Sequence, residues 1–197
     1  MGKRQSVMGT AAIVLAVLVY GDVSSNAKDP GDQVALSPAT VADYVHAVIE
    51  ADRTFYTINI VERLQAKGVV TATEHWRMTN TLPLPAQFLR ESSELAARTG
   101  SRIGYRLISL WPINQQNGPA DEFERAGLQD ILVNQERAYT GTVTSGGERS
   151  FRAIYADRAV SQACIGCHNA HSNSPKRDFK QNDVMGGIVI TIPLDKP

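Results

Sequence analysis

Apolar residues recur every three or four positions between Pro38 and Lys67, and charged residues occupy the other faces. This period predicts one long amphipathic helix, entered through Ser37 and Pro38 and ended by Gly68. The apolar stripe consists of Val41, Val45, Ile49, Tyr56 and Ile60. At about 100° per residue, Tyr56 lies near the middle of this stripe, so we expect Tyr56 to contact whatever the helix covers.

After this helix the pattern predicts shorter helices and then changes to strands. The sequence indicates helices at 73–80 and 87–98, a strand at 103–111, a helix from about 120, two strands within 139–158, a short helix around the cysteines and a strand at 186–194. The two strands flank Ser145-Gly146-Gly147, whose glycines can adopt positive φ in a hairpin turn. Helices first and an antiparallel hairpin later favour an α+β fold, one sheet with helices packed on it.

The first residues have the composition of a secretory signal peptide. Lys3 and Arg4 form a basic start, the run from Ala11 to Tyr20 is apolar, and Ser25-Asn26-Ala27 supplies small residues for cleavage. The apolar run is shorter than the roughly 20 residues that span a bilayer, which favours cleavage over a retained anchor. We therefore expect export to the periplasm. The expected organisation is a signal peptide (1–27), a linker (28–38) and one domain (39–197).

The balance of charged residues restricts the classes of molecule that the protein is expected to bind. The whole chain carries 20 basic and 20 acidic residues, and removing residues 1–27 leaves 18 against 19 (20 minus 2 and 20 minus 1), a net charge of −1. This balance argues against nucleic acid and against an anionic membrane surface as partners. No later stretch is apolar enough for stable membrane insertion after cleavage. The chain has only two cysteines, so it would lack the disulfide framework of many exported proteins.

Both cysteines belong to the stretch Cys164-Ile165-Gly166-Cys167-His168, which is the attachment sequence for haem c. Two thiols at this spacing lie on one turn of helix and can form thioethers with the two vinyl groups of one porphyrin. His168 is then directed at the iron as the proximal ligand. Attachment takes place outside the cytoplasm, where the signal peptide would send the chain. The expected cofactor is therefore one covalent haem c.

Three alternatives explain the same residues less well. Zinc could bind Cys164, Cys167, His168 and His171, but four ligands within eight residues give poor tetrahedral geometry. A thioredoxin-like redox pair needs a βαβ setting, which the order of helices and hairpin does not provide. A structural disulfide across two intervening residues would be strained.

The chain resembles the PAS-like single-haem c domains. The resemblance rests on "RTFYT" in the first helix, "LPLPAQFL", "YRLISLWPIN", "NGPADEFE", and a late CxxCH followed by "GGIVI". These domains occur as exported haem c proteins and as extracytoplasmic haem sensor domains of chemoreceptors and histidine kinases. The resemblance implies a PAS-like antiparallel sheet, a long N-terminal helix and a covalent haem packed between them. Some members use a cysteine on that helix as the sixth iron ligand, and this helix contains none.

The distal iron ligand must therefore be chosen from other residues. Tyr56 is one candidate because of its central place on the stripe, with Arg53 nearby to favour its phenolate form. The other reading of Tyr56 is a buried tyrosine with a hydrogen-bonded hydroxyl. His46 is an alternative ligand, although it lies at the edge of the stripe, about 80° from Tyr56. The remaining candidates are water and the side chains of His75, Met78 and Met185.

Three functions fit a single exported haem. A redox or small-gas sensor, for instance of nitric oxide, would change iron ligation and report the change to a partner protein. A soluble electron carrier would keep two strong ligands in both oxidation states. An enzyme, such as a peroxidase or an NO-metabolising protein, would need a distal acid–base residue, and the sequence identifies none. The absence of a strong second ligand on the stripe favours the sensor, with electron transfer as the alternative.

Overall fold

The computed structural model describes residue 2 and residues 35–195. The expected signal peptide and the linker up to residue 34 fall outside this range, apart from residue 2. Residues from Leu36 onward form one unit. Within residues 35–195, no helix is both long enough and apolar enough to cross a bilayer.

A long helical rod begins the described fold and has three consecutive parts: α1 (Pro38–Phe55), the π-helix η2 (Tyr56–Glu62) and α2 (Arg63–Ala66). The Ser37 hydroxyl accepts a hydrogen bond from the Thr40 amide at 3.1 Å, which satisfies one of the free N–H groups at the start of the helix. Gly68 adopts φ +64°, a conformation that favours glycine after a helix. The long helix expected from the sequence is thus confirmed, including both ends.

A four-stranded antiparallel sheet forms the centre of the fold, in the order β3-β6-β5-β4. Its strands are β3 (Gly104–Ile108), β4 (Tyr139–Ser145), β5 (Glu148–Arg158) and β6 (Val184–Pro193). The β4–β5 turn is the expected hairpin, with Gly146 at φ +60° and Gly147 at φ +84°. The α+β class expected from the sequence is confirmed.

The remaining elements are short connections and three helices that pack on the sheet or close one end of it. They are β1 (Ala72–Thr73), α3 (Trp76–Thr79), β2 (Leu82–Pro83), α4 (Pro85–Ala97), η3 (Gln115–Asn117), α5 (Glu122–Val133) and α6 (Gln162–Ala170). The helix expected at 73–80 is only one turn long, because Ala72 and Thr73 instead pair in parallel with Leu82 and Pro83.

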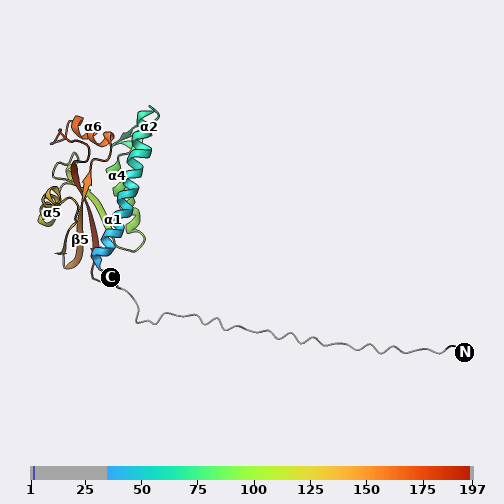
Figure 1. Ribbon diagram of the computed structural model, residues 1–197, viewed down its shortest axis with the longest axis vertical. Helices are drawn as coiled ribbons and strands as arrows, with labels where there is room; N and C mark the ends of the chain where they lie inside the picture. Colours follow the sequence, from blue (N-terminus) through green and yellow to red (C-terminus); the bar gives the residue numbers. More distant parts are fainter. Residues whose placement is uncertain (1, 3–34, 196–197) are drawn as a thin grey trace. The chain divides into compact units, whose positions relative to one another are not determined.

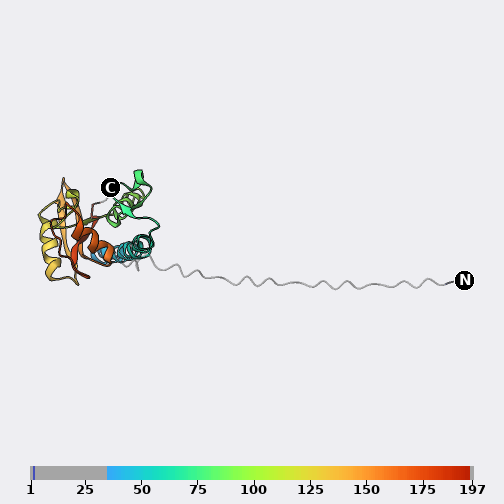
Figure 2. The same cartoon turned by 90° about the horizontal axis from the view of Figure 1, so that it is seen from above.

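Helices cover both faces of the sheet (Figures 1 and 2). Ile188 and Ile190 of β6 pack in one cluster with Ala42 and Ile49 of α1 and with Leu89 of α4. Successive residues of a strand point to opposite faces. The intervening residue Val189 accordingly packs with Leu128 and Ile131 of α5. The α6 helix lies at one end of the sheet, near the π-helical segment η2 (Figure 1).

The buried face of the long helix differs from the expected stripe. The buried residues are Ala42, Ile49, Arg53, Thr57 and Val61, whereas Tyr56 and Ile60 are only half-buried. Two causes explain the difference. The helix is π-helical from Tyr56 to Glu62, so a constant 100° per residue does not hold there. In addition, the buried face includes polar side chains, which a search for apolar periodicity passes over.

We expect Gly186→Ala to destabilise the fold by about 1–3 kcal/mol or more, since overpacking of a rigid core costs this much. A Cβ at Gly186 would lie 2.3 Å from the backbone oxygen of Ile108 on the neighbouring strand, and a backbone atom cannot move aside as a side chain can. Urea unfolding measures the change. The matched control is Gly104→Ala, also in the sheet, where a Cβ meets nothing within 4 Å. Equal stability of the two variants would contradict the close approach.

Candidate functional site

A cavity of about 1220 Å³ lies where the long helix, the end of the sheet and α6 meet. It exceeds the roughly 300–1,000 Å³ that is usual for small-molecule sites, so it can accept a large cofactor. Residues of η2, of the β1 region, of the start of α4, of the end of β3 and of α6 all contribute to its lining. The walls are therefore assembled from segments far apart in the sequence.

The α6 helix brings the cysteine motif to this cavity. The hydroxyl of Ser161 accepts a hydrogen bond from the Ala163 amide at 3.1 Å and so caps the start of α6. Cys164, Cys167 and His168 all line the cavity. Both cysteines are free thiols, and burial raises the pKa of the Cys167 thiol. The structure thus brings together the three residues that the sequence assigns to cofactor attachment.

The imidazole of His168 is suited to metal ligation. It packs edge-on against Phe179, with ring centroids 5.8 Å apart. Its Nδ1 atom is buried without a hydrogen-bond partner within the described residues. Burial, followed by the charges of His171 and Arg53, lowers the pKa of His168. The ring is therefore neutral at neutral pH, which is the form that binds a metal.

A buried ion pair lies in the wall of the same cavity. Arg53 of α1 contacts Asp157 of β5 through two nitrogen–oxygen pairs, at 2.7 and 3.1 Å, and both residues line the cavity. The residues are 6% and 7% exposed. Burial raises the pKa of Asp157, and the Arg53 guanidinium opposes that rise. Arg53 therefore lines the same cavity as the cysteine motif, but its partner is Asp157 and not Tyr56.

Tyr56 does not join this group. Its hydroxyl donates a 2.7 Å hydrogen bond to the carbonyl of Pro83, and its ring stacks on Phe88 with centroids 4.4 Å apart. It is not among the residues that line the cavity. Burial raises the pKa of Tyr56 to about 12, opposite to the shift that a phenolate ligand requires. The structure thus corrects the expected placement, and Tyr56 matches the other reading, a packed and hydrogen-bonded tyrosine.

His46 also lies elsewhere. Its ring stacks on Tyr155 with centroids 3.8 Å apart and an interplanar angle of 8°, and it does not line the cavity. Burial lowers the pKa of His46, so the ring is neutral and packs as an aromatic group. Because His46 and Arg53 are seven residues apart on one helix, their side chains sit two turns apart. The alternative distal ligand proposed from the sequence is therefore not beside the cysteine motif.

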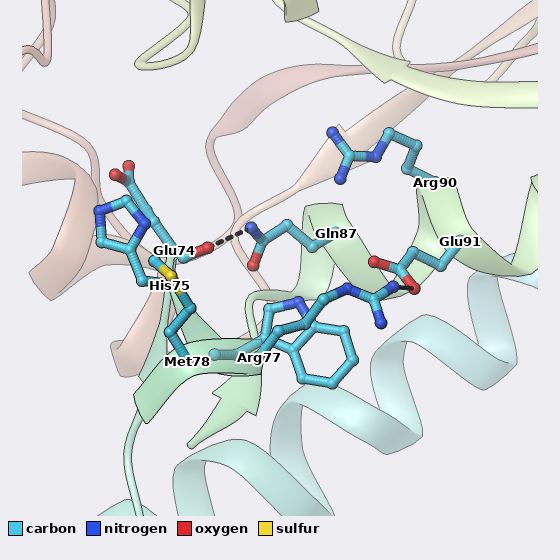
Figure 3. Close-up of a pocket in the computed structure, with 8 residues that line it drawn as sticks. Glu74, His75, Arg77, Met78, Gln87, Arg90 and Glu91 are labelled. Carbon is cyan, nitrogen blue, oxygen red and sulfur yellow. Dashed lines mark hydrogen bonds and ion pairs between the residues drawn. The ribbon is translucent and has the colours of Figure 1, made fainter. Parts of the chain in front are cut away.

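Of the other candidates, His75 and Met185 line the main cavity and Met78 does not. Met78 belongs to a smaller pocket of about 310 Å³, which shares His75, Glu74 and Gln87 with the main cavity. In this pocket the Gln87 side chain donates to the Glu74 carbonyl at 2.8 Å, and Arg77 pairs with Glu91 (Figure 3). Met78 is 77% exposed, so it is unsuited to ligate iron in the main cavity.

Sequence reasoning missed Asp157 and Thr57, both of which line the cavity. Asp157 ends the apolar run of β5, and an acidic residue at that point could have been noticed as a partner for a buried arginine. Thr57 carried no signal, because one hydroxyl on a helix is usually exposed or bonded to its own backbone. Its hydroxyl does donate to the Arg53 carbonyl, at 2.7 Å.

The donor set fits a covalently attached porphyrin better than a bare metal ion. Within the described residues, no group of three or more His, Cys, Asp or Glu side chains is arranged to hold a metal ion, so the zinc alternative gains no support. Two thiols and a neutral imidazole beside a large cavity instead match the groups that hold haem c. The buried Nδ1 of His168 has no partner within the described residues, so this ring has a nitrogen that a bound group could satisfy.

A comparison with known protein families found a match. Residues 25–193 match the family described as "Tll0287-like: Tll0287". The chain belongs to the Tll0287-like family. The crystal structure of the cyanobacterial heme-protein Tll0287 has a similar fold, with a TM-score of 0.53 and 17% sequence identity over 82% of this chain and 99% of that one. No curated protein matches the chain.

We expect Tyr56→Phe to cost about 1 kcal/mol of stability through the lost hydrogen bond to Pro83. The stack on Phe88 remains in this variant. Thermal or urea unfolding measures the cost, and the absorption spectrum of the purified protein should stay unchanged. A ferric charge-transfer band that disappears in Tyr56→Phe would show instead that the tyrosine binds iron.

Proposed function

We propose that this Tll0287-like protein is an exported c-type haem protein. One haem would be held by thioethers to Cys164 and Cys167, with His168 as the proximal iron ligand. The single observation that carries the proposal is that these three side chains line one large cavity from a single helix. The heme-protein Tll0287, with a similar fold, supports it by analogy. Export to the periplasm rests on the signal sequence in residues 1–27.

We further propose that the bound haem senses redox state or a small gas such as nitric oxide through a change of iron ligation. The haem supplies an iron centre whose sixth position depends on the protein. Tyr56 and His46, the two helix residues favoured by the sequence, do not line the cavity. In their place the helix presents Arg53, which cannot ligate iron because it stays protonated. This arrangement leaves room for an exchangeable ligand.

Electron transfer is the second candidate function. It is favoured by one observation, that Met185 and His75 both line the cavity. Methionine and histidine are ordinary axial ligands of haem in electron carriers. Met185 is 6% exposed, and its sulfur would be shielded from solvent. A permanent sixth ligand from either residue would leave no position for a gas and would reduce the rearrangement on electron transfer. Catalysis as a peroxidase or an NO-metabolising enzyme is the less favoured function.

We expect the double variant Cys164→Ala, Cys167→Ala to contain no covalent haem, because both thioether positions are lost. The protein is produced in an exporting host with a haem c maturation system and then extracted with acidified acetone. In the wild type the colour should stay with the protein, and mass spectrometry should show one added haem.

His168→Ala serves as the control for attachment, since both thiols remain. We expect this variant to keep covalent haem and to lose the wild-type spectrum, because the proximal nitrogen is gone. Colour that passes into the solvent from the wild type would contradict covalent attachment. An unchanged spectrum in His168→Ala would assign the iron to a different ligand, such as His171.

We expect nitric oxide to change the absorption spectrum of the ferrous wild-type protein in a saturable, one-to-one manner, as an exchangeable sixth position requires. Met185→Leu is the diagnostic variant, because it keeps the volume of the side chain and removes the sulfur. If the protein is a sensor with an exchangeable sixth ligand, Met185→Leu has the same absorption spectrum as the wild type. A wild-type spectrum that resists nitric oxide and changes in Met185→Leu would instead favour the electron carrier.

A further inference from the structure

Arg53 carries more hydrogen-bond donors than the protein uses. A guanidinium group has five N–H donors. Two nitrogens of Arg53 contact Asp157, at 2.7 and 3.1 Å, and the third, Nε, is buried without a partner within the described residues. No other acceptor for this side chain occurs in that part of the chain. Unused donors on a buried cation are costly, so a further acceptor is expected.

The guanidinium of Arg53 is fixed by its buried partner. Asp157 holds the guanidinium from the end of β5. The Thr57 hydroxyl donates to the Arg53 carbonyl at 2.7 Å, at the point where the helix passes into its π-helical segment. Such π-helical turns are frequent at functional sites. A fixed guanidinium has already lost most of its conformational freedom, which favours binding of a matching group.

Arg53 is also the only lysine or arginine among the described residues that line the cavity. It lines the same cavity as His168. The planar fork of a guanidinium matches carboxylates and other oxyanions that accept two parallel hydrogen bonds. Asp157 offsets much of the charge, so the match depends mainly on donor geometry.

We propose that Arg53, held by Asp157, is an anion-binding residue of the cavity. Its unused N–H groups bind a carboxylate or a small oxyanion. This group comes either from solvent, as an exogenous ligand near the cofactor, or from the cofactor itself, as a propionate of the haem. The haem propionate exists only if haem is bound, so this second source rests on the proposed function.

The test compares wild type with Arg53→Met, which keeps an unbranched apolar chain in place of the arginine stem and removes every donor. Because Arg53→Met leaves Asp157 buried and unpaired, the double variant Arg53→Met, Asp157→Asn is measured beside it. Arg106→Met is the matched control. Arg106 also pairs with a buried carboxylate, Glu124 at 2.5 Å, but neither residue lines the cavity.

Formate is the probe for an anion from solvent. It is titrated into the ferric haem-loaded protein and followed by absorption. If the anion comes from solvent, formate shifts the spectrum with saturation, and Arg53→Met and the double variant raise the apparent Kd about tenfold or more, as expected for hydrogen bonds to a charged group. Arg106→Met binds formate as the wild type does.

The reduction potential is the readout for a propionate of the haem. In that case formate has no saturable effect on the wild type. The midpoint potential shifts in Arg53→Met and in the double variant, because a buried propionate loses its partner, and it stays unchanged in Arg106→Met. Unchanged formate affinity together with an unchanged potential in both Arg53 variants would overturn the proposal.

A wild-type protein without covalent haem would contradict the proposed function alone. In that event formate is added during thermal unfolding of the same protein. A rise in Tm that both Arg53 variants lose and Arg106→Met retains would still support anion binding at Arg53. No rise in the wild type would overturn it.

Discussion

The buried contact between Arg53 and Asp157 connects the two halves of this fold. It ties the long N-terminal helix to the end of β5, a few residues before α6 begins. A buried charge left without its partner typically costs about 3–5 kcal/mol. The helix can therefore not slide or rotate against the sheet without a large penalty. The pair thus constrains which residues the helix presents to the cavity.

The rest of the site is arranged around this contact. Asp157 pairs with Gly186 near the end of the sheet, and the absence of a side chain at Gly186 lets β3 approach β6 closely. The chain then turns into α6, whose capped start directs Cys164, Cys167 and His168 to the cavity. One cavity is thus lined by residues more than a hundred positions apart in the sequence.

His168 and Arg53 respond differently to the same burial. Burial lowers the pKa of His168, because a low dielectric disfavours its charged form. A guanidinium stays charged even when buried, and a carboxylate lies against that of Arg53. The same cavity is therefore lined by an uncharged imidazole and a charged guanidinium.

The sequence alone determined the local features: the long helix with its ends at Ser37 and Gly68, the hairpin at Gly146-Gly147, and the short helix that carries both cysteines. These depend on neighbouring residues, through periodicity, caps and turn conformations. Only the tertiary structure decided which residues face the motif. The apolar stripe indicated Tyr56 and His46, but the helix buries the polar residues Arg53 and Thr57. A buried arginine is stable only because Asp157, 104 positions away, meets it, and the π-helical segment changes the period from Tyr56 onward. Neither effect is visible in local spacing, since the first needs a distant partner and the second needs the packed surroundings of the helix.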